Sequence, residues 1–247
     1  MSEPEDFFGE DVAAAYDESV AQQFTPAELE QTAAVLAHLA GSGAALELGI
    51  GTGRVAVPLA ERGVAVTGID LSRAMVERLR TKPGGHAIPV TIGDFATRRV
   101  PGEFSLVYLV FNTIMNVTTQ AGQTDCFRNA AAHLRPGGSF LVECMVPGLR
   151  LLPPGQSSVP FAVGPPTWAF DVYEPATQAM SSNYLTIEDG ETRHRSIPFR
   201  YVWPAELDLM AEIAGMHLTE RWEDWARSPF TAESTKQISV WQKPSGA

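Results

Sequence analysis

The sequence is poor in cysteine, and its two cysteines stand far apart. Cys126 and Cys144 are the only ones in 247 residues, and they form no CxxC pair. This count excludes a disulfide framework and the usual structural zinc patterns. We therefore expect two buried thiols in a reducing compartment, and no metal site.

Long apolar runs and an excess of basic charge are also missing. No stretch approaches the ~20 consecutive apolar residues that a membrane span needs. Residues 1–6 are acidic, whereas a signal peptide would be basic and then apolar. The formal net charge is -11 at pH 7, while nucleic acids and anionic membranes select basic surfaces. These absences favour a cytoplasmic protein, a monomer or homodimer, with neither nucleic acid nor membrane as a partner.

Apolar runs and helical segments alternate over residues 44–146. The chain is long enough for one substantial core with a decorating lid. The alternation predicts a parallel sheet with helices on both faces. The predicted strands are residues 44–48, 64–70, 88–92, 104–111 and 139–146, with helices at residues 54–62, after Ser72 and at residues 123–134.

A different texture follows the fifth predicted strand. Residues 147–166 are rich in proline, glycine and serine, and three runs within residues 167–202 alternate with period two. Asp189-Gly190 indicates a hairpin turn, and Pro198 confines its strand to an edge or a bulge. We predict that residues 147–202 form an inserted antiparallel β lid.

The two ends of the chain complete this organisation. Residues 1–41 predict an amino-terminal helical arm, because Thr25-Pro26-Ala27-Glu28 reads as a capping box. Residues 203–247 predict a helix from Pro204 and two closing strands. Residues 42–146 and 203–247 are therefore expected to form one core.

A glycine-rich turn, Gly49-Ile50-Gly51-Thr52-Gly53, lies between the first predicted strand and the following helix. Such a turn brings backbone close to a ligand and points amides at its polar groups. Gly51 to Ala56 also satisfies G-x-G-x-x-A, and Asp70 stands nineteen residues after Gly51. Because this spacing nearly matches the dinucleotide fingerprint, NAD(P) binding stays an open alternative.

Three acidic residues follow three successive predicted strands. Glu47 stands at the end of an otherwise apolar strand, where its carboxylate needs a polar partner such as a ligand ammonium. Asp70 can accept hydrogen bonds from ribose hydroxyls. Asp94 can serve an adenine amino group with Phe95 against the ring, although a turn residue is an equally good reading. Together they are more specific than any one alone.

At these residues the chain resembles the class I S-adenosylmethionine (SAM) dependent methyltransferases. Glu47 to Gly53 is similar to the family's E/D-x-G-x-G-x-G, and the turn Leu134-Arg135-Pro136-Gly137-Gly138 is similar to a later motif. The resemblance implies an α/β fold, a Rossmann-like doubly wound seven-stranded sheet of order 3-2-1-4-5-7-6 with strand 7 antiparallel. It also implies SAM as cofactor. The cofactor-binding residues that it implies are Tyr16, Glu47, Gly49, Gly51, Thr52, Gly53, Asp70, Leu71, Met75, Asp94, Phe95 and Phe111.

The inserted lid and the Ala15-Tyr16-Asp17 segment resemble a narrower group, small-molecule methyltransferases such as glycine N-methyltransferase and the sugar-amine N,N-dimethyltransferases of antibiotic pathways. This likeness implies methyl transfer to a nitrogen or oxygen of a small molecule. The run Phe111-Asn112-Thr113-Ile114 is not the N/D-P-P-Y/F motif of DNA and glutamine N-methyltransferases. Candidate catalytic residues are Asn112, Asn116, Tyr16, Glu143 and His194, each with a structural alternative such as helix capping or packing.

Two other classes of function stay open on the sequence alone. One is an NAD(P)-binding oxidoreductase, which would tolerate loss of Glu47. The other is a protein of the SAM-dependent fold that transfers no methyl group, such as an aminopropyltransferase or a binding regulator. An aminopropyltransferase would carry acids after the fourth strand, where this chain has Asn112 and Asn116.

Overall fold

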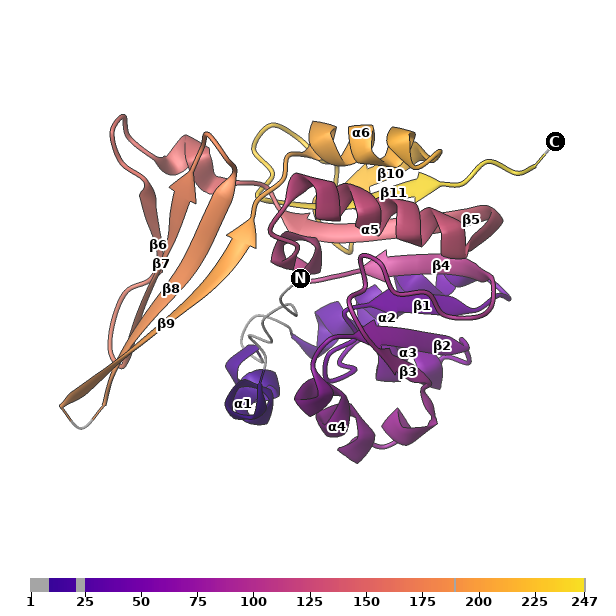
Figure 1. The fold of residues 1–247 in the computed structure, drawn as a ribbon, viewed down its shortest axis with the longest axis horizontal. Helices are drawn as coiled ribbons and strands as arrows, with labels where there is room; N and C mark the ends of the chain where they lie inside the picture. Colours follow the sequence, from indigo (N-terminus) through magenta and orange to yellow (C-terminus); the bar gives the residue numbers. More distant parts are fainter. Residues whose placement is uncertain (1–8, 21–24, 189, 247) are drawn as a thin grey trace.

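The computed structural model describes residues 9–20, 25–188 and 190–246, and these residues form two β-sheets. The larger sheet has seven strands in the order β10-β11-β5-β4-β1-β2-β3 (Figure 1). Only β11 runs antiparallel to its neighbours, β5 and β10. The predicted strand order and the antiparallel seventh strand are therefore confirmed. The strands are β1 (Ala45–Leu48), β2 (Val66–Asp70), β3 (Val90–Ile92), β4 (Phe104–Leu109), β5 (Leu134–Met145), β10 (His217–Trp222) and β11 (Lys236–Gln242).

Helices cover both faces of this sheet because its strands are buried on both sides. One apolar cluster packs one face against α5 and α6, through residues such as Phe127 and Leu207. A second cluster packs the other face against α2, α3 and α4, through Leu36, Leu59 and Leu79. The helices are α1 (Glu10–Val20), α2 (Pro26–Ala40), α3 (Ala56–Glu61), α4 (Arg73–Thr81), α5 (Gln120–His133) and α6 (Pro204–Ile213), with short 3-10 turns η1 (Gly85–Ala87), η2 (Thr113–Asn116) and η3 (Gly148–Leu151).

The smaller sheet is antiparallel and follows β5 in the chain. Its order is β6-β7-β8-β9, with β6 (Ser158–Ala162), β7 (Thr167–Glu174), β8 (Ala179–Glu188) and β9 (Glu191–Arg200). We call these four strands the lid. Strand β9, which contains Pro198, is an edge strand as predicted. Strand β6 was not predicted, because it lies in the segment rich in proline, glycine and serine.

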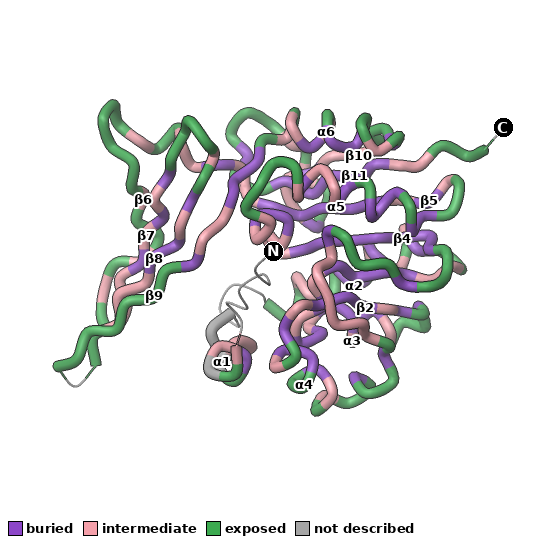
Figure 2. The backbone as a smooth tube through the Cα atoms, in the orientation of Figure 1, coloured by how far each residue is buried: buried purple, intermediate pink, exposed green. Residues whose placement is uncertain are grey.

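The lid is joined to the core at one end and exposed at the other. Tyr173, Met180 and Tyr201 belong to the same apolar cluster as the core helices α5 and α6. Figure 2 shows the opposite end of the lid as mostly exposed backbone. The packing of a small two-faced sheet is therefore concentrated where it meets the core.

The predicted amino-terminal arm is only partly described. Residues 1–8 and 21–24 lie outside the described residues, as does Asp189 of the predicted hairpin turn. The capping box at Thr25 is confirmed, since Thr25 and Glu28 exchange both hydrogen bonds. No helix in the described ranges is long and apolar enough to cross a membrane. Among the same residues, no group of three or more His, Cys, Asp or Glu side chains could hold a metal ion.

Candidate active site

A pocket opens at the carboxyl edge of the large sheet, where β1 and β4 end. Parallel strands present their following loops at one such edge, and ligands of open α/β sheets bind there. The glycine-rich turn, the residues after β4 and helix α1 supply its walls. The lining residues are Tyr16, Glu47, Gly49, Ile50, Gly51, Thr52, Arg54, Val55, Val110, Phe111 and Thr113.

Glu47 is the buried carboxyl group of this pocket, with only 3% of its surface exposed. The hydroxyl of Tyr108 on the neighbouring strand β4 donates to Glu47 Oε2 at 2.9 Å. Burial raises the pKa of Glu47 to about 8, against an ordinary value of 4.5. Burial thus favours the neutral form of the Glu47 carboxyl group, and a cation placed beside it would favour the ionised form.

Asp70 ends β2 and organises the glycine-rich turn. Its Oδ2 accepts a hydrogen bond from the Gly51 amide at 2.6 Å, and its Oδ1 accepts one from the Ser72 amide at 2.8 Å. Ionised carboxylates accept strong hydrogen bonds at about four positions. Asp70 can therefore fix the turn and still accept hydrogen bonds from ligand hydroxyls.

The three glycines of the turn are required by its backbone and its packing. Gly49, Gly51 and Gly53 all have positive φ, at 74°, 53° and 70°, where side chains other than glycine's are strained. A Cβ on Gly53 would lie 2.1 Å from Leu79 Cδ1. The turn is thus a compact cradle in which backbone, rather than side chains, faces the pocket.

The residues after β4 are held in an uncommon conformation. Phe111 and Asn112 have φ of 58° and 60°, although neither is glycine. Glu143 on β5 fixes this bend, because its Oε2 accepts from the Phe111 amide at 3.0 Å and its Oε1 accepts from Trp225 Nε1 at 3.3 Å. The guanidinium of Arg54 stands over the Phe111 ring, 4.7 Å from its centroid. Glu143 therefore holds the backbone of Phe111, and Arg54 contacts its ring.

Helix α1 is fastened across the glycine-rich turn. Thr52 Oγ1 donates to Asp17 Oδ1 at 2.6 Å, and Lys82 Nζ lies 2.7 Å from Asp17 Oδ2. Lys82 Nζ also donates to Thr52 Oγ1 at 3.1 Å. Tyr16, the residue before Asp17, lines the pocket. We call Asp17, Thr52 and Lys82 the α1 latch.

The remaining predicted cofactor residues lie around the turn but do not line the pocket. The methyl carbon of Met75 is 3.4 Å from the Cβ position of Gly51, and a ring carbon of Phe95 is 3.6 Å from that of Gly49. Asp94 Oδ1 accepts from the Ala96 amide at 2.8 Å, as a turn residue does. Leu71 is partly exposed beside Asp70.

The candidate catalytic residues separate into two groups. Tyr16 lines the pocket, whereas Glu143 and Asn112 make structural hydrogen bonds. Asn112 Oδ1 accepts from the Met145 amide at 2.6 Å and makes no side-chain bond to cap η2. Asn116 ends η2 outside the pocket lining.

His194, on strand β9 of the lid, does not line the pocket. It shares a sheet face with Trp168, since both stand opposite Leu185 in register. Its ring nitrogen contacts Asn183 Oδ1 at 3.3 Å. The structure therefore does not bring His194 to the pocket.

Sequence reasoning missed four residues that shape this site. Tyr108 lies in the apolar strand β4, and Arg54 lies just before helix α3. Thr113 begins the short turn η2, and Lys82 directly follows helix α4. Each reaches the site through a partner distant in the sequence, as Tyr108 reaches Glu47 and Lys82 reaches Asp17. The polar hydroxyl of Tyr108 inside a buried strand was the one signal that could have been used, because buried hydroxyls need partners.

The fold and this pocket define a class I SAM-dependent methyltransferase, and comparison with known proteins agrees. Residues 45–138 match the family model described as "Methyltransferase domain". Over nearly its whole length, 96% of this chain and 98% of the other, the structure is similar to the CcbJ methyltransferase from Streptomyces caelestis, with 33% identity and a TM-score of 0.85. The chain therefore belongs to the SAM-dependent methyltransferases.

Two further relatives carry related descriptions. The cypemycin N-terminal methyltransferase of a Streptomyces species is 29% identical over 203 residues, which cover 80% of this chain and 82% of the relative. The SAM-bound amino pentose methyltransferase CalS10 from Micromonospora echinaspora is 20% identical, with a TM-score of 0.68 over 97% of this chain and 99% of the other. At that identity, the second likeness concerns the fold alone.

The pocket residues fit SAM as cofactor. The cradle of positive-φ glycines leaves backbone facing the pocket, and two buried carboxyl groups, Glu47 and Asp70, stand at its inner end and beside the turn. These groups suit an ammonium and a pair of hydroxyls, which SAM carries on its methionine part and on its ribose. The family assignment therefore favours SAM over the dinucleotide alternative that the glycine spacing left open.

Proposed function

We propose that the protein transfers the methyl group of SAM to a nitrogen or oxygen atom of a small molecule. The observation that carries this proposal is the pocket of Glu47, the glycine-rich turn and Phe111, closed on one side by α1. The full-length likeness to CcbJ supports it, as do relatives whose names specify the amino terminus of cypemycin and an amino pentose. The acidic net charge of -11 argues against nucleic acid as the acceptor.

In this proposal each end of SAM is held by a different part of the pocket. Glu47, Gly49, Gly51, Thr52 and Gly53 hold the methionine part. Asp70 accepts hydrogen bonds from the ribose hydroxyls, which charged acceptors bind strongly. The residues assigned to the adenine are Leu71, Met75, Asp94 and Phe95, and those assigned to the sulfonium end are Phe111 and Tyr16.

The residues act mainly by alignment and by exclusion of water. When bound, SAM supplies an electrophilic methyl carbon: the acceptor lone pair forms the new bond to it, the carbon–sulfur bond breaks, and its electron pair stays on sulfur. Phe111, fixed by Glu143 and Arg54, shapes the wall beside the reacting centre. Tyr16 covers the pocket from α1. Holding two reactants in line in this way can supply up to ~7–11 kcal/mol of the barrier.

Binding of S-adenosylhomocysteine, the demethylated product of SAM, tests the cofactor site. Asp70→Asn should weaken this binding about 100-fold, or ~2.7 kcal/mol, measured by calorimetry. The new amide group would face the amide of Gly51 or Ser72, where both oxygens now accept. Asp70→Ala should lose the binding altogether.

Asp125→Asn is the matched control, because it removes one carboxylate from an exposed ion pair with Arg128 on α5. It should leave the affinity for S-adenosylhomocysteine unchanged. The proposal is wrong if the wild-type protein binds NADH but not S-adenosylhomocysteine. It is also wrong if mass spectrometry finds no methyl transfer from SAM to any compound of a library of amines, phenols and hydroxy acids.

A further inference from the structure

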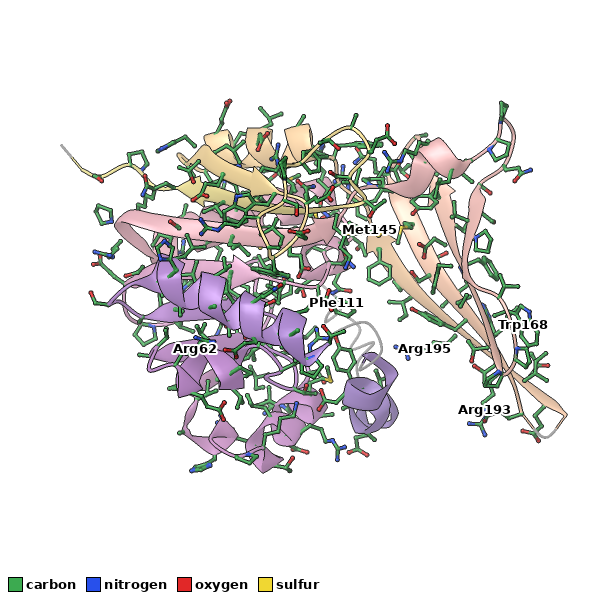
Figure 3. The ribbon with its side chains drawn as sticks, turned by 180° about the vertical axis from the view of Figure 1, so that it is seen from behind. Arg62, Phe111, Met145, Trp168, Arg193 and Arg195 are labelled. Atoms are coloured by element: carbon green, nitrogen blue, oxygen red, sulfur yellow. The ribbon has the colours of Figure 1, made fainter. Side chains whose placement is uncertain are left out.

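We call the pocket at the carboxyl edge of the large sheet the donor pocket. One face of the lid carries a group of polar residues that do not line it. Asp171 stands opposite Ser182, and Tyr184 stands opposite Arg195, two residues further from the core along β8. Tyr173 is on the same face, two residues nearer the core along β7. We call these five residues the inner lid face. Figure 3 shows the Arg195 side chain between the lid and α1, so this face is turned toward the core.

Asp171 is the buried member of the inner lid face, with 8% of its surface exposed. Ser182 Oγ donates to its Oδ1 at 2.6 Å. Burial raises the pKa of Asp171, and hydrogen bonds from Ser182 and Tyr173 oppose that shift. The partners of this carboxyl group are therefore hydroxyls, which are neutral.

The cluster lies close to the end of β5. The Gly148 amide, three residues after β5, donates to the Tyr173 hydroxyl at 3.4 Å. The carboxyl ends of parallel strands such as β4 and β5 meet at one edge of the sheet, and the donor pocket lies at that edge. Asp171, two residues before Tyr173 on β7, therefore lies at the end of the lid that joins the core.

A partly buried carboxylate beside the lid, Glu206, shows what Asp171 lacks. Glu206 on α6 lies 2.7 Å from Arg200 and accepts from Gln120 and Gln178, each at 2.8 Å. These partners hold the pKa of Glu206 below its ordinary value. Among the described residues, none of the ion pairs involves Asp171. A buried carboxylate without a cation is costly, and a cationic ligand would offset that cost.

We propose that the inner lid face is the acceptor site and that it binds an amine, with the Asp171 carboxylate accepting a hydrogen bond from the reacting nitrogen. This inference rests on the proposed methyl transfer and narrows its acceptor from nitrogen or oxygen to an amine. The amine reacts in its neutral form, so an ammonium bound there first loses one proton to bulk water; as the nitrogen–carbon bond then forms, positive charge moves from sulfur to nitrogen. A carboxylate beside that nitrogen therefore stabilises the transition state more than the ground state.

The outer part of the same face suits the apolar body of such an acceptor. The Phe161 and Tyr184 rings contact each other edge to face, with centroids 5.6 Å apart. The Arg195 guanidinium stands 6.0 Å from the Tyr184 ring centroid. Phe161 is 48% exposed although it is a large apolar side chain. An aromatic surface beside a buried acid is a common arrangement for binding organic amines.

A matched pair of probes tests the proposal without knowledge of the natural acceptor. Tyramine and 4-(2-hydroxyethyl)phenol differ only in an amino group against a hydroxyl group. We expect protein saturated with S-adenosylhomocysteine to bind tyramine about tenfold more tightly than the alcohol, as one charge-assisted hydrogen bond would produce. Calorimetry or ligand-observed NMR would measure both affinities.

Asp171→Asn should abolish this preference, because it removes the negative charge that distinguishes an amine from an alcohol. The amide keeps the size of the side chain and can still accept from Ser182. The matched control is Glu191→Gln, which removes one exposed carboxylate from the lid and should keep the preference. Both variants should retain the wild-type affinity for S-adenosylhomocysteine and the wild-type melting temperature, which shows that they are folded.

The outcomes distinguish this inference from the function on which it rests. If the wild-type protein does not bind S-adenosylhomocysteine, the proposed function fails. Two results overturn only the assignment of Asp171, provided that the wild-type protein binds S-adenosylhomocysteine. One is equal affinity for tyramine and the alcohol, and the other is no binding of either probe up to its solubility limit. A preference that survives Asp171→Asn also overturns it.

Discussion

The lid region and the carboxyl edge of the large sheet, where the donor pocket lies, both contain carboxyl groups shielded from solvent, but the hydrogen-bond donors to these groups differ. We call this edge of the sheet the donor edge. At the donor edge, Asp70 accepts from backbone amides of the turn and of the residues beside it. In the lid region, Asp171 and Glu206 accept from side chains, such as Ser182 for Asp171 and Gln120 for Glu206. Asp70 is therefore held by main-chain donors, whereas the two carboxyl groups of the lid region are held by side-chain donors.

This difference separates two functions within one chain. Main-chain donors are present whatever the side chain is, so a site built from them tolerates substitutions elsewhere, which suits a cofactor that never varies. Side-chain pairing across strands can be altered one residue at a time, which suits recognition of an acceptor. Changes at the lid should therefore leave the binding of S-adenosylhomocysteine intact, and changes at the donor edge should not.

The largest effect is expected from Arg200→Met, at the junction between lid and core. Arg200 is 5% exposed and bonds both Glu206, at 2.7 Å, and Gln123, at 2.5 Å. Its loss leaves the partly buried Glu206 carboxylate without its cation, so the free energy of unfolding should fall by as much as about 3–5 kcal/mol. Urea denaturation would measure the change.

The affinity of folded Arg200→Met for S-adenosylhomocysteine should nevertheless stay within about a factor of two of wild type, since distant sites act additively. The double variant Arg200→Met/Glu206→Gln should recover part of the lost stability, because the stranded charge is gone. A strong loss of ligand affinity in Arg200→Met would show that the two regions are not independent.

The next effect is a pH dependence at the donor edge. The pKa of Glu47 is raised to about 8 in the folded protein, against an ordinary 4.5. The folded state thus binds the extra proton between these values, and the free energy of unfolding should fall as pH rises from about 4.5 to 8. Pairing with a ligand ammonium requires the ionised form, so binding must release that proton.

The affinity for S-adenosylhomocysteine should therefore rise with pH up to about 8, by at most about tenfold per pH unit. Calorimetry at pH 7 in buffers of different ionisation enthalpy would detect the released proton. Glu47→Gln should bind more weakly and without proton release. An affinity of the wild-type protein that is flat from pH 6 to 8 contradicts a role for Glu47 in binding the ammonium.

The sequence was informative where burial and backbone decide structure. The strand over residues 45–48, the turn at Gly49 to Gly53 and the acid at Asp70 all follow from apolar runs and glycine chemistry, and they lie where predicted. Strand β6 was missed, because Pro160 and its neighbours form a strand only by pairing with β7. β-structure of this kind depends on its partner more than on intrinsic propensity.

The same contrast applies to the side chains of the site. Glu47 could be predicted as a buried acid, but Tyr108 as its donor could not, since 61 residues separate them. Glu143 was a catalytic candidate on its position alone. Its bonds to Phe111 and Trp225 depend on how three separate segments meet. Only the three-dimensional structure could distinguish these roles.

The smallest effect is expected at the α1 latch, which joins the arm to the donor edge by side chains alone. Lys82 and Asp17 are partly exposed, at 27% and 40% of their side-chain surface, so solvent screens their attraction. Lys82→Met should weaken the binding of S-adenosylhomocysteine only about threefold to fivefold. The loss should appear as faster dissociation in stopped-flow measurements, since α1 covers the bound ligand.

Salt distinguishes the latch from a direct contact with the ligand. Raising the ionic strength should weaken binding to the wild-type protein and narrow its difference from Lys82→Met, because screening acts on the Asp17–Lys82 pair. Arg128→Met, which breaks a comparable exposed pair on α5, is the control and should bind as wild type does. If Lys82→Met dissociates at the wild-type rate in low salt, α1 does not retain the ligand, and the donor edge is as self-sufficient as its backbone construction suggests.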